Sequence, residues 1–530
     1  MGSTPQSWAE ALRAVQPLPI FGLAGSSNLR FLAQHRSNGG HVIQVQHEAA
    51  AVAMAAGWAE ATGLVGIASV HQGPGFTNAL TALIDAQRGW LPIILLTGHT
   101  DDPMHHQAID TVGLCDRLGI AAVIPRTAQP EEFGRLLEQS ARARCPIVVL
   151  PPETTSIRPQ FVSQEVSHET VAIPDAVLTP ISTAQRIGVI AGRGAVRTNA
   201  LAPIQELAEH LDALLLTTLP AHGAFAGRPR YAGSIGGFAT ERATAALQSC
   251  DVVIAFGAGL DHWSTAGGRI FSADAVVIRI DPRADAGGEH VVALPMDALT
   301  AANHLRSQLA PRPTTGWAST AAVLGRQPRH FGDPAPGLDP RQLLAELDAL
   351  LPARRRLVLD SGHFIALAAM FLTGGDGPHL IFGQDFQSVG LGLAKAIGAA
   401  IAEDDRLTVA VIGDGGAAMS LLEIATAVDL RLPLLVIIMN DASYGAEVHD
   451  FEPLGVDVSV AKSPLRNWAA VATALGATAH RVTAMADLAV LQTWLANREG
   501  PLVLDCQVNP DVDAISVMTA EGLAEWSCAD

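Results

Sequence analysis

The strongest constraint on the fold of this chain is a regular alternation of two kinds of segment. Short runs rich in Val, Ile and Leu alternate with longer stretches rich in Ala and Leu along almost the whole sequence. Parallel strands are joined by crossover connections of about a dozen residues or more, usually a helix, so this rhythm predicts parallel sheets covered by helices. The expected fold class is α/β, built from doubly wound parallel sheets.

Two stretches rich in proline and polar residues, 150–170 and 309–340, interrupt this rhythm and are expected to be linkers. A chain of 530 residues is also too long for a single hydrophobic core. The sequence therefore predicts three α/β domains, over residues 1–165, 180–315 and 340–530.

Each block contains four clear apolar runs that are expected to be strands. They lie at 40–46, 65–71, 92–97 and 146–150 in the first block, at 186–195, 213–218, 251–259 and 275–282 in the second, and at 355–362, 407–416, 432–441 and 501–508 in the third. Ligands of open α/β sheets bind outside the carboxyl ends of the strands. Polar residues directly after an apolar run, such as His71 and Gln72, are therefore candidate site residues.

The charge and cysteine patterns argue against several classes of function. The formal net charge is −18 and no basic run is interleaved with aromatic residues, so neither nucleic acid nor an anionic membrane is an expected partner. The N-terminus has no signal-peptide pattern and no apolar run reaches membrane length, which predicts a cytoplasmic protein. The scattered cysteines form no CxxC pair, so neither a disulfide framework nor a zinc site is expected.

Residues 409–447 carry the most informative pattern. Two apolar runs end in polar turns, which consist of Gly413, Asp414, Gly415 and Gly416 after the first run and of Asn440, Asp441, Ala442, Ser443, Tyr444 and Gly445 after the second. Glycines let a bulky anion approach, a helix start offers free N–H groups to phosphate, and carboxylates are the hard oxygen ligands that Mg²⁺ prefers. Without a ligand the same residues would form ordinary turns, so each turn alone leaves both explanations open.

A second pattern lies at residues 42–80. Glu48 begins an Ala-rich helix directly after an apolar run, and a Gly-Pro-Gly turn at 73–75 follows the next run. A carboxylate that is buried among alanines needs a partner. A Glu in the first turn of a helix also complements the helix dipole without any ligand, so this residue alone does not decide between a catalytic and a structural role.

Together the two patterns resemble the thiamin diphosphate (ThDP) enzymes. The 24 residues between Gly415 and Asn440 are similar to the spacing of that family's diphosphate motif, in which Gly-Asp-Gly is followed by Asn-Asn. Residues 42–80 resemble the pyrimidine-binding domain of acetolactate synthases and benzoylformate decarboxylases. The resemblance covers nearly the whole chain, in the order pyrimidine-binding, middle and diphosphate-binding domain.

The resemblance implies roles for the cofactor-site residues. Glu48 would hydrogen-bond to a ring nitrogen of the aminopyrimidine and so promote loss of the thiazolium C2 proton. The side chains of Asp414 and Asp441 and the carbonyl of Ser443 would bind Mg²⁺, although Asp441 stands where the family usually has Asn. Val389 would lie under the cofactor and bend it into a V. The other residues implied to contact ThDP are Ser361, Gly362, His363, Gly413, Gly415, Gly416, Tyr444 and Gly445.

The resemblance also implies an assembly. In this family the activating Glu and the Mg²⁺ site meet across a subunit interface, so a homodimer is the smallest competent unit and a dimer of dimers is usual. Residues 256–265 lie where synthases contact flavin, but the turn at 192–195 lacks a complete GxGxxG pattern. FAD binding therefore stays open, with its absence favoured.

For the reaction, His71 is similar in position to the catalytic His of benzoylformate decarboxylases, and Gln72 follows it. This implies a ThDP- and Mg²⁺-dependent 2-oxo acid decarboxylase or carboligase, in which a bond next to the carbonyl breaks or forms through an enamine intermediate and His71 relays protons. The other histidines that are candidates near such a site are His99, His105, His106 and His262.

Two alternatives to this lyase stay open. The stretch 73–86 and the DTVGL phrase at 110–114 resemble acetolactate synthases, which implies a transferase that joins two 2-oxo acids. The second alternative is a protein that binds ThDP without turnover, which the presence of Glu48, Asp414 and Asp441 disfavours.

Overall fold

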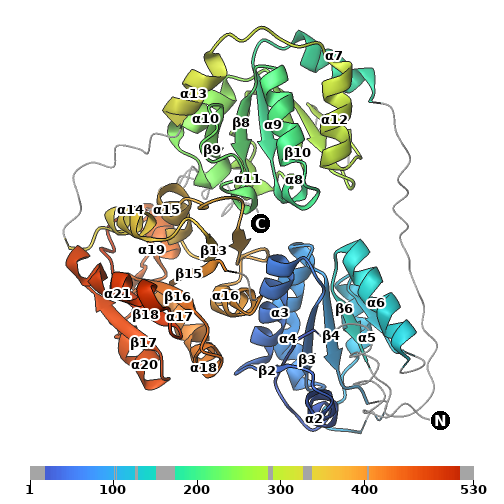
Figure 1. Ribbon diagram of the computed structural model, residues 1–530, viewed down its shortest axis with the longest axis vertical. Coiled ribbons are helices and arrows are strands. Elements are labelled where there is room, and N and C mark those ends of the chain that lie inside the picture. Colours follow the sequence, from blue (N-terminus) through green and yellow to red (C-terminus); the bar gives the residue numbers. More distant parts are fainter. Residues whose placement is uncertain are drawn as a thin grey trace.

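The computed structural model describes residues 18–100, 102, 104–125, 129–150, 173–284, 290–325, 337–402 and 405–513. This part of the chain forms three six-stranded parallel sheets with helices packed against them (Figure 1). The expected α/β class with three parallel-sheet units is therefore confirmed. Among the helices in these ranges, none is long and apolar enough to cross a membrane.

The first sheet has the strand order β2-β1-β3-β4-β6-β5. Its strands are β1 (Ile20–Gly22), β2 (Val42–Gln44), β3 (Gly66–Val70), β4 (Ile93–Thr97), β5 (Ala121–Val123) and β6 (Ile147–Val149). Its helices are α2 (Leu29–Ser37), α3 (Glu48–Thr62), α4 (Pro74–Arg88), α5 (Thr111–Arg117) and α6 (Pro130–Ala143). The strand order reverses between β1 and β3, so the loops after β1, β3 and β4 meet at one edge of the sheet.

The middle sheet has the order β12-β11-β10-β7-β8-β9, which is that of a dinucleotide-binding fold. Its strands are β7 (Ile187–Ala191), β8 (Leu214–Thr217), β9 (Tyr231–Ser234), β10 (Val252–Phe256), β11 (Val276–Ile280) and β12 (Val291–Leu294). Its helices are α7 (Asp175–Thr183), α8 (Arg193–Arg197), α9 (Leu201–His210), η1 (Leu219–Ala221), η2 (Gly236–Phe238), α10 (Glu241–Gln248), α11 (His262–Thr265), α12 (Ala298–Gln308) and α13 (Trp317–Gly325).

Helix α13 corrects one expectation, because it lies inside the stretch expected to be the second linker. Its last residue, Gly325, packs so closely against Ala232 of β9 that a Cβ on it would lie 3.0 Å from the Ala232 side chain. The Gly325 carbonyl also accepts a hydrogen bond from the Thr240 hydroxyl. Residues 317–325 therefore belong to the middle domain. The other expected linker falls almost entirely outside the described residues.

The third sheet repeats the topology of the first, with the order β14-β13-β15-β16-β18-β17. Its strands are β13 (Arg355–Leu359), β14 (Leu380–Phe382), β15 (Leu407–Gly413), β16 (Leu434–Asn440), β17 (Thr478–Val482) and β18 (Leu502–Gln507). Its helices are α14 (Pro340–Leu350), α15 (Phe364–Phe371), α16 (Gly392–Ala400), α17 (Asp414–Ser420), η3 (Leu421–Glu423), α18 (Ile424–Asp429), α19 (Gly445–Phe451), η4 (Glu452–Leu454), η5 (Ser459–Ala461), α20 (Trp468–Ala474), η6 (Met485–Leu488) and α21 (Ala489–Asn497).

The first and third domains share one hydrophobic core, in which α3 packs against α16 (Figure 1). A Cβ on Gly57 would lie 1.9 Å from the Lys395 carbonyl, and one on Gly398 would lie 1.9 Å from the Met54 carbonyl. Glycine is therefore required at both contacts. Because residue 54 faces 398 and residue 57 faces 395, the two helices run antiparallel.

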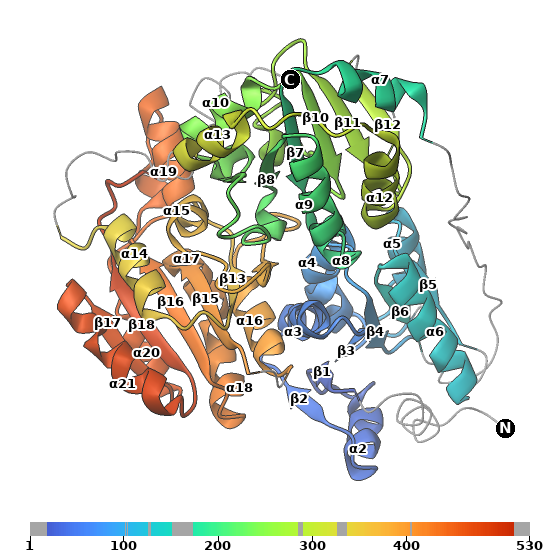
Figure 2. The same cartoon turned by 45° about the horizontal axis from the view of Figure 1, so that its top comes forward.

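A buried cluster of charges joins all three domains. Lys395 on α16 pairs with Asp85 on α4 at 2.5 Å, and each side chain is 1% exposed. Asp385 pairs with Arg193 on α8 at 2.7 Å, and Arg193 also donates to the Gly89 carbonyl, which brings α8 against the end of α4 (Figure 2). Burial alone would lower the pKa of Lys395, but the carboxylates of Asp85 and Asp385 raise it above its usual value. The cluster therefore holds a permanent cation in the core.

Candidate active site

One group of polar side chains lies at the carboxyl ends of β1, β3 and β4. His71 follows β3, Ser27 lies in the loop after β1, and Gln107 comes from the loop after β4. The His71 Nδ1 atom accepts from the Ser27 hydroxyl at 2.7 Å and from the Ser27 backbone N–H at 3.2 Å. Its Nε2 lies 3.1 Å from the Gln107 Oε1 atom.

These contacts indicate the tautomer of His71. A backbone N–H can only donate, so Nδ1 is an acceptor and the ring proton lies on Nε2, which donates to Gln107. The Ser27 hydroxyl accepts from the Gln72 backbone N–H at 3.0 Å, which leaves its own proton for His71. The Gln72 side chain also donates to Gln107 Oε1, at 3.3 Å. The proton on Nε2 is thus directed away from Ser27.

Two glycines at this edge are needed for the close packing of His71. A Cβ on Gly25 would lie 2.7 Å from the His71 ring. Gly73 has a φ of +61°, and a Cβ on it would lie 2.6 Å from the Gln107 carbonyl. The Gly-Pro-Gly turn therefore allows Gln107 to approach His71, because only glycine tolerates both the dihedral angle and the contact.

Glu48 lies beside this group. It is the first residue of α3, whose N-cap is His47, and its Oε2 atom accepts a hydrogen bond from the Asn78 side chain at 3.1 Å. A Cβ on Gly75 would lie 3.5 Å from Glu48 Oε1 and 3.1 Å from His71 Cβ. Glu48 and His71 therefore flank Gly75 on the same edge of the first sheet.

A second group lies at the carboxyl ends of β15 and β16 in the third sheet. Burial, together with the charge of Asp441 and a hydrogen bond to it, raises the pKa of Asp414 to about 7. Two carboxyl groups in contact inside the protein repel each other when both are ionised. A divalent cation bound between them would remove this repulsion, so the donor set fits Mg²⁺.

The turn after β16 is shaped around this carboxylate pair. Ser443 donates its backbone N–H to Asp441 Oδ1 at 3.0 Å, and Ala442 adopts a φ of +60°, which is rare for a residue with a side chain. Asn440 points elsewhere, because its side chain donates to Asp505 at 2.7 Å. Asp441 is therefore the side chain of this turn that faces Asp414.

The glycines of both turns allow two aromatic rings to pack closely next to the carboxylates. A Cβ on Gly415 would lie 2.7 Å from the Tyr444 ring, and one on Gly445 would lie 2.3 Å from the His363 ring. His363 Nε2 lies 3.7 Å from Asp441 Oδ2, and burial lowers the pKa of His363 although Asp441 opposes this shift. The expected residues 413–416, 441–445 and His363 thus gather around one point, which fits the diphosphate end of ThDP.

Ser361, Gly362 and Val389 lie nearby. The Ser361 hydroxyl donates to Gln384 Oε1 at 2.8 Å. A Cβ on Gly416 would lie 3.7 Å from the Val389 side chain.

Asp360, which the sequence analysis did not identify, holds the loop after Val389. Its carboxylate accepts hydrogen bonds from the backbone N–H groups of Gly390 and Gly392, at 3.0 to 3.1 Å. Burial raises the pKa of Asp360 to about 6, and these hydrogen bonds oppose the shift. Asp360 fixes the loop that carries Val389.

The two groups of one chain do not lie next to each other. Gly57 of α3 faces Lys395 of α16, and Glu48 lies nine residues before Gly57, at the start of α3. Val389 precedes Lys395 in the chain. Because the two helices are antiparallel, Val389 lies towards the opposite end of the helix pair from Glu48. With a rise of about 1.5 Å per residue, Glu48 and Val389 are roughly 15 Å or more apart. One cofactor molecule that is bent over Val389 would not reach Glu48 of the same chain.

The remaining histidines have different positions. His105 and His106 stack on each other with ring centroids 4.6 Å apart, and His105 Nδ1 accepts the Gln107 N–H at 3.2 Å. They shape the loop that presents Gln107 to His71. His262 begins α11 in the middle domain, and its side chain lies outside the described part of the structure.

Ser27 and Gln107 contact His71 and are candidate site residues that the sequence analysis missed. Ser27 follows a strand of only three residues, and Gln107 lies in a polar loop with no strand or helix of its own. The available signal was their place after β1 and β4, which requires the strand order of the sheet to be known.

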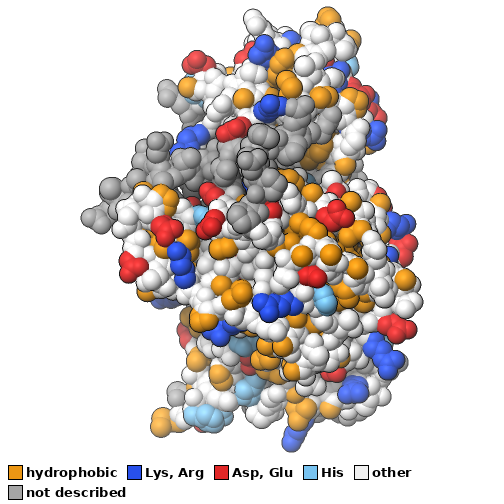
Figure 3. All heavy atoms as spheres, turned by 90° about the vertical axis from the view of Figure 1, so that its left-hand side faces the viewer, with side chains coloured by type: hydrophobic (Ala, Val, Ile, Leu, Met, Phe, Trp, Pro, Cys, Tyr) orange, Lys and Arg blue, Asp and Glu red, His pale blue; other side chains and the backbone are white. Residues whose placement is uncertain are grey.

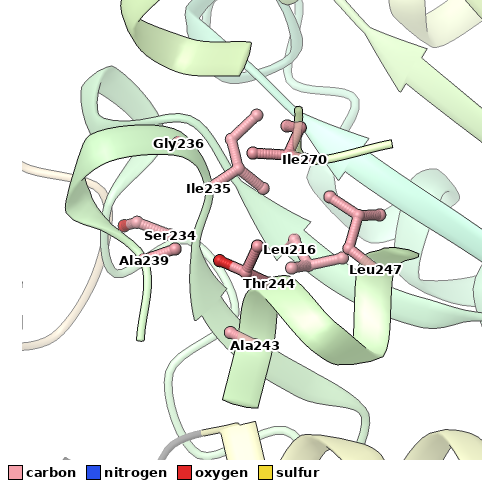
Figure 4. A pocket seen from close by; sticks show the side chains of 9 residues that line it. All are labelled: Leu216, Ser234, Ile235, Gly236, Ala239, Ala243, Thr244, Leu247 and Ile270. Atoms are coloured by element: carbon pink, nitrogen blue, oxygen red, sulfur yellow. The ribbon is translucent and has the colours of Figure 1, made fainter. Parts of the chain in front are cut away.

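The middle domain contains a small hollow between β8, β9 and α10 (Figure 4). It is lined by Leu216, Ser234, Ile235, Gly236, Ala239, Ala243, Thr244, Leu247 and Ile270. It shares no residue with either polar group, and its lining is mostly apolar. We regard it as a gap in the packing rather than a binding site.

The fold and the two groups define a class of proteins. The first and third sheets have the same topology, and each has polar side chains at its strand ends. The first sheet carries a Glu and a His, and the third carries a carboxylate pair. This arrangement is that of enzymes that hold a two-part cofactor between two such domains. Three family models match the chain: the N-terminal, central and C-terminal domains of thiamine pyrophosphate enzymes, over residues 5–116, 175–305 and 360–506. The chain belongs to the thiamine pyrophosphate enzyme family and carries its two thiamine pyrophosphate-binding domains.

Relatives within this family catalyse different reactions. The chain is 25% identical to the acetolactate synthase isozyme 2 large subunit of Escherichia coli over 523 residues, which covers 94% of each chain. It is 26% identical over 487 residues to sulfoacetaldehyde acetyltransferase of Alcaligenes xylosoxydans xylosoxydans, covering 81% and 79% of the two chains. The crystal structure of benzoylformate decarboxylase from Polynucleobacter necessarius superimposes with a TM-score of 0.82 at 19% identity, covering 97% of this chain and all of the other. This last likeness shows the fold.

Proposed function

We propose that the protein is a ThDP- and Mg²⁺-dependent 2-oxo acid decarboxylase or carboligase. The observation that carries the proposal is the position of Glu48 and His71 on either side of Gly75. This arrangement supports a role for Glu48 as the acid that faces the pyrimidine ring and for the His71 imidazole as the group that faces the substrate. When bound, ThDP supplies a nucleophilic carbon and an electron sink for cleavage or formation of the bond next to a carbonyl.

In this proposal each group of side chains has a separate task. Asp414, Asp441 and the Ser443 carbonyl hold Mg²⁺ and with it the diphosphate, and Val389 supports the thiazolium ring. Glu48 holds a proton at the pyrimidine ring. His71 Nε2–H, directed by Ser27, exchanges a proton with the substrate, while Gln72 and Gln107 orient the polar end of the 2-oxo acid.

We further propose that the working unit is at least a homodimer. Glu48 lies too far from Val389 of its own chain, so a second chain must bring the two groups together. Met419 on α17 and Leu422 on η3, close to the carboxylate pair, are 59% and 64% exposed in the single chain. Apolar side chains also gather on the face of the chain shown in Figure 3. Exposed apolar groups beside an incomplete site are typical of a subunit interface.

A second candidate function is an acetolactate synthase-like transferase, which the name of the Escherichia coli relative favours. Mass spectrometry of the products formed from a panel of 2-oxo acids with ThDP and Mg²⁺ distinguishes the two. The lyase predicts aldehydes and carboligation products with added aldehyde, whereas the transferase predicts acetolactate or a homologue as the main product from pyruvate. Absence of turnover with all members of the panel would contradict both.

The first prediction concerns His71. Replacement by Ala removes the proton donor, so kcat/KM for the best 2-oxo acid should fall about 100-fold or more, whereas the Kd for ThDP should change little. Steady-state kinetics and a ThDP titration measure the two quantities. His41, exposed in the loop before β2, provides the matched control His41→Ala. Equal kcat/KM for His71→Ala and the control would exclude a catalytic role.

The second prediction concerns the carboxylate pair. The folded chain without metal holds an extra proton at Asp414 between pH 3.8 and about 7, so its stability falls as the pH rises through this window and stays low above it. Asp414→Asn removes the repulsion and should raise the melting temperature of the cofactor-free chain at pH 8. The same variant should need about 10-fold more Mg²⁺ or more for half-saturation of ThDP binding.

Thermal melts without cofactor and Mg²⁺ titrations test this prediction together. The control is Asp405→Asn, an exposed residue that pairs with Arg354 on the surface. A variant Asp414→Asn that melts at a lower temperature and retains its Mg²⁺ requirement would show that Asp414 is a structural residue rather than a ligand.

A further inference from the structure

The segment immediately before α3 is anchored by a residue of the third domain. Glu423, at the end of η3 in the third domain, is 3% exposed. Both of its carboxylate oxygens lie 3.1 Å from the backbone N–H of Gln46. The backbone N–H of His47 also donates to it and lowers its pKa. The next residue along the chain is Glu48.

A second contact holds the same segment. Thr426 on α18, also 3% exposed, donates its hydroxyl to the Gln44 carbonyl at 2.9 Å. Gln44 ends β2, which has three residues and pairs with β1 at the edge of its sheet. Residues 44–47 are thus held by two side chains of the third domain as well as by their own sheet.

The chemical nature of Glu423 is significant. Its described partners are backbone N–H groups, and burial raises its pKa to about 7 although these hydrogen bonds oppose the shift. A buried carboxylate without a cationic partner costs stability, and an apolar residue would avoid this cost. A carboxylate has two acceptor oxygens and no hydrogen, so it can receive two backbone N–H groups at once. The amide of Gln would present a donor to one of them.

We propose that Glu423 is a positioning residue for Glu48. It fixes the two residues before α3 from the diphosphate-binding domain, and so sets where the first side chain of α3 points. This inference rests on the proposed function, because it assigns Glu423 a role only through the proton that Glu48 holds at the pyrimidine ring. Glu423 itself touches neither cofactor nor substrate.

The test compares Glu423→Gln with Glu499→Gln, the same substitution at an exposed position near β18. Proton–deuterium exchange at C2 of bound ThDP should slow by up to about 100-fold in Glu423→Gln, since small displacements of a catalytic group have effects of this size. The Kd for ThDP and Mg²⁺ should stay within about 3-fold of wild type, because the diphosphate site is intact. Glu499→Gln should match wild type in both.

A second readout needs no cofactor. Hydrogen–deuterium exchange of the peptide over residues 42–52 in the cofactor-free protein should be at least about 10-fold faster in Glu423→Gln, because the N–H groups of Gln46 and His47 lose their acceptor. Thr426→Val should accelerate exchange of the same peptide to a smaller extent. Thr426→Ser, which keeps the hydroxyl, should leave the exchange rate unchanged. This Thr pair keeps the proposal testable where Glu423→Gln folds poorly.

The outcomes separate the two proposals. If wild type neither binds ThDP nor exchanges the C2 proton, the proposed function is wrong. If wild type exchanges the C2 proton and Glu423→Gln does so equally fast, or if the peptide over 42–52 is equally protected in both, Glu423 does not position Glu48. If Glu423→Gln loses ThDP affinity in proportion to its loss of exchange, its role is structural and the inference is overturned.

Discussion

The variant Glu48→Gln is expected to lower the rate of C2 proton exchange in bound ThDP, and kcat with it, by about 10²- to 10⁴-fold. Gln keeps the size of the side chain and its contact with Asn78, but an amide does not hold the acidic proton that the pyrimidine ring needs. Exchange followed by NMR after acid quench measures this step directly. The Kd for ThDP should remain close to that of wild type, because in the proposed site Mg²⁺ and the third domain hold the diphosphate.

Glu131 provides a matched control for this variant. It is an exposed Glu in the first turn of α6, as Glu48 is in the first turn of α3. If Glu48 only complemented the helix dipole, Glu48→Gln and Glu131→Gln would each cost about 0.3–1 kcal/mol of stability and leave exchange unchanged. Unchanged exchange in Glu48→Gln would also support a ThDP-binding protein without turnover.

The second large effect concerns stability. Lys395→Met should destabilise the cofactor-free protein by about 3–5 kcal/mol, because it leaves the Asp85 carboxylate buried without its cation. Burial already raises the pKa of Asp85, and the ammonium of Lys395 is the main group that opposes this shift. Urea unfolding measures this loss of stability. The relevant quantity is the midpoint of the transition in which the shared core of the first and third domains unfolds.

The double variant Asp85→Asn/Lys395→Met tests the cause. Asn can still accept the Phe386 N–H that Asp85 accepts at 2.9 Å, but it carries no charge. Removal of both charges should therefore recover more than half of the lost stability. Lys462→Met serves as the control, since Lys462 forms an exposed ion pair with Glu452. A loss in Lys395→Met no larger than in this control would show that the buried pair does not hold the domains together.

The sequence was sufficient for the repeated architecture but not for the whole of each sheet. Long apolar runs such as those that became β15 and β16 were recognised because both faces of these strands are buried. Each sheet also has two strands that were not anticipated: β1 and β5, β9 and β12, and β14 and β17. Most of these have three or four residues and lie at or near sheet edges, where a short or partly exposed strand has no distinctive pattern.

For the candidate site, the sequence predicted residues that belong to compact local motifs. His71, Asp414 and Asp441 each follow a strand directly, and Glu48 begins the helix after β2, so their position needs only local information. Ser27, Gln107 and Glu423 act through residues that are far away in the sequence, and the residue numbers of the partners differ by 44, 36 and 377. Such contacts depend on strand order and on the packing of one domain against another, which local patterns do not contain.

Complementation between two impaired variants tests the central claim most directly, namely that Glu48 of one chain serves the cofactor held by Asp414 of another. Glu48→Gln and Asp414→Asn chains are co-expressed with different tags and assayed as a mixture. The assay uses a Mg²⁺ concentration that saturates wild type but not Asp414→Asn, so that each variant alone has little activity. A shared site predicts about a quarter of wild-type activity, because half of randomly assorted dimers are mixed and one of their two sites is intact. Mixed dimers, isolated through both tags, that remain inactive would contradict the account.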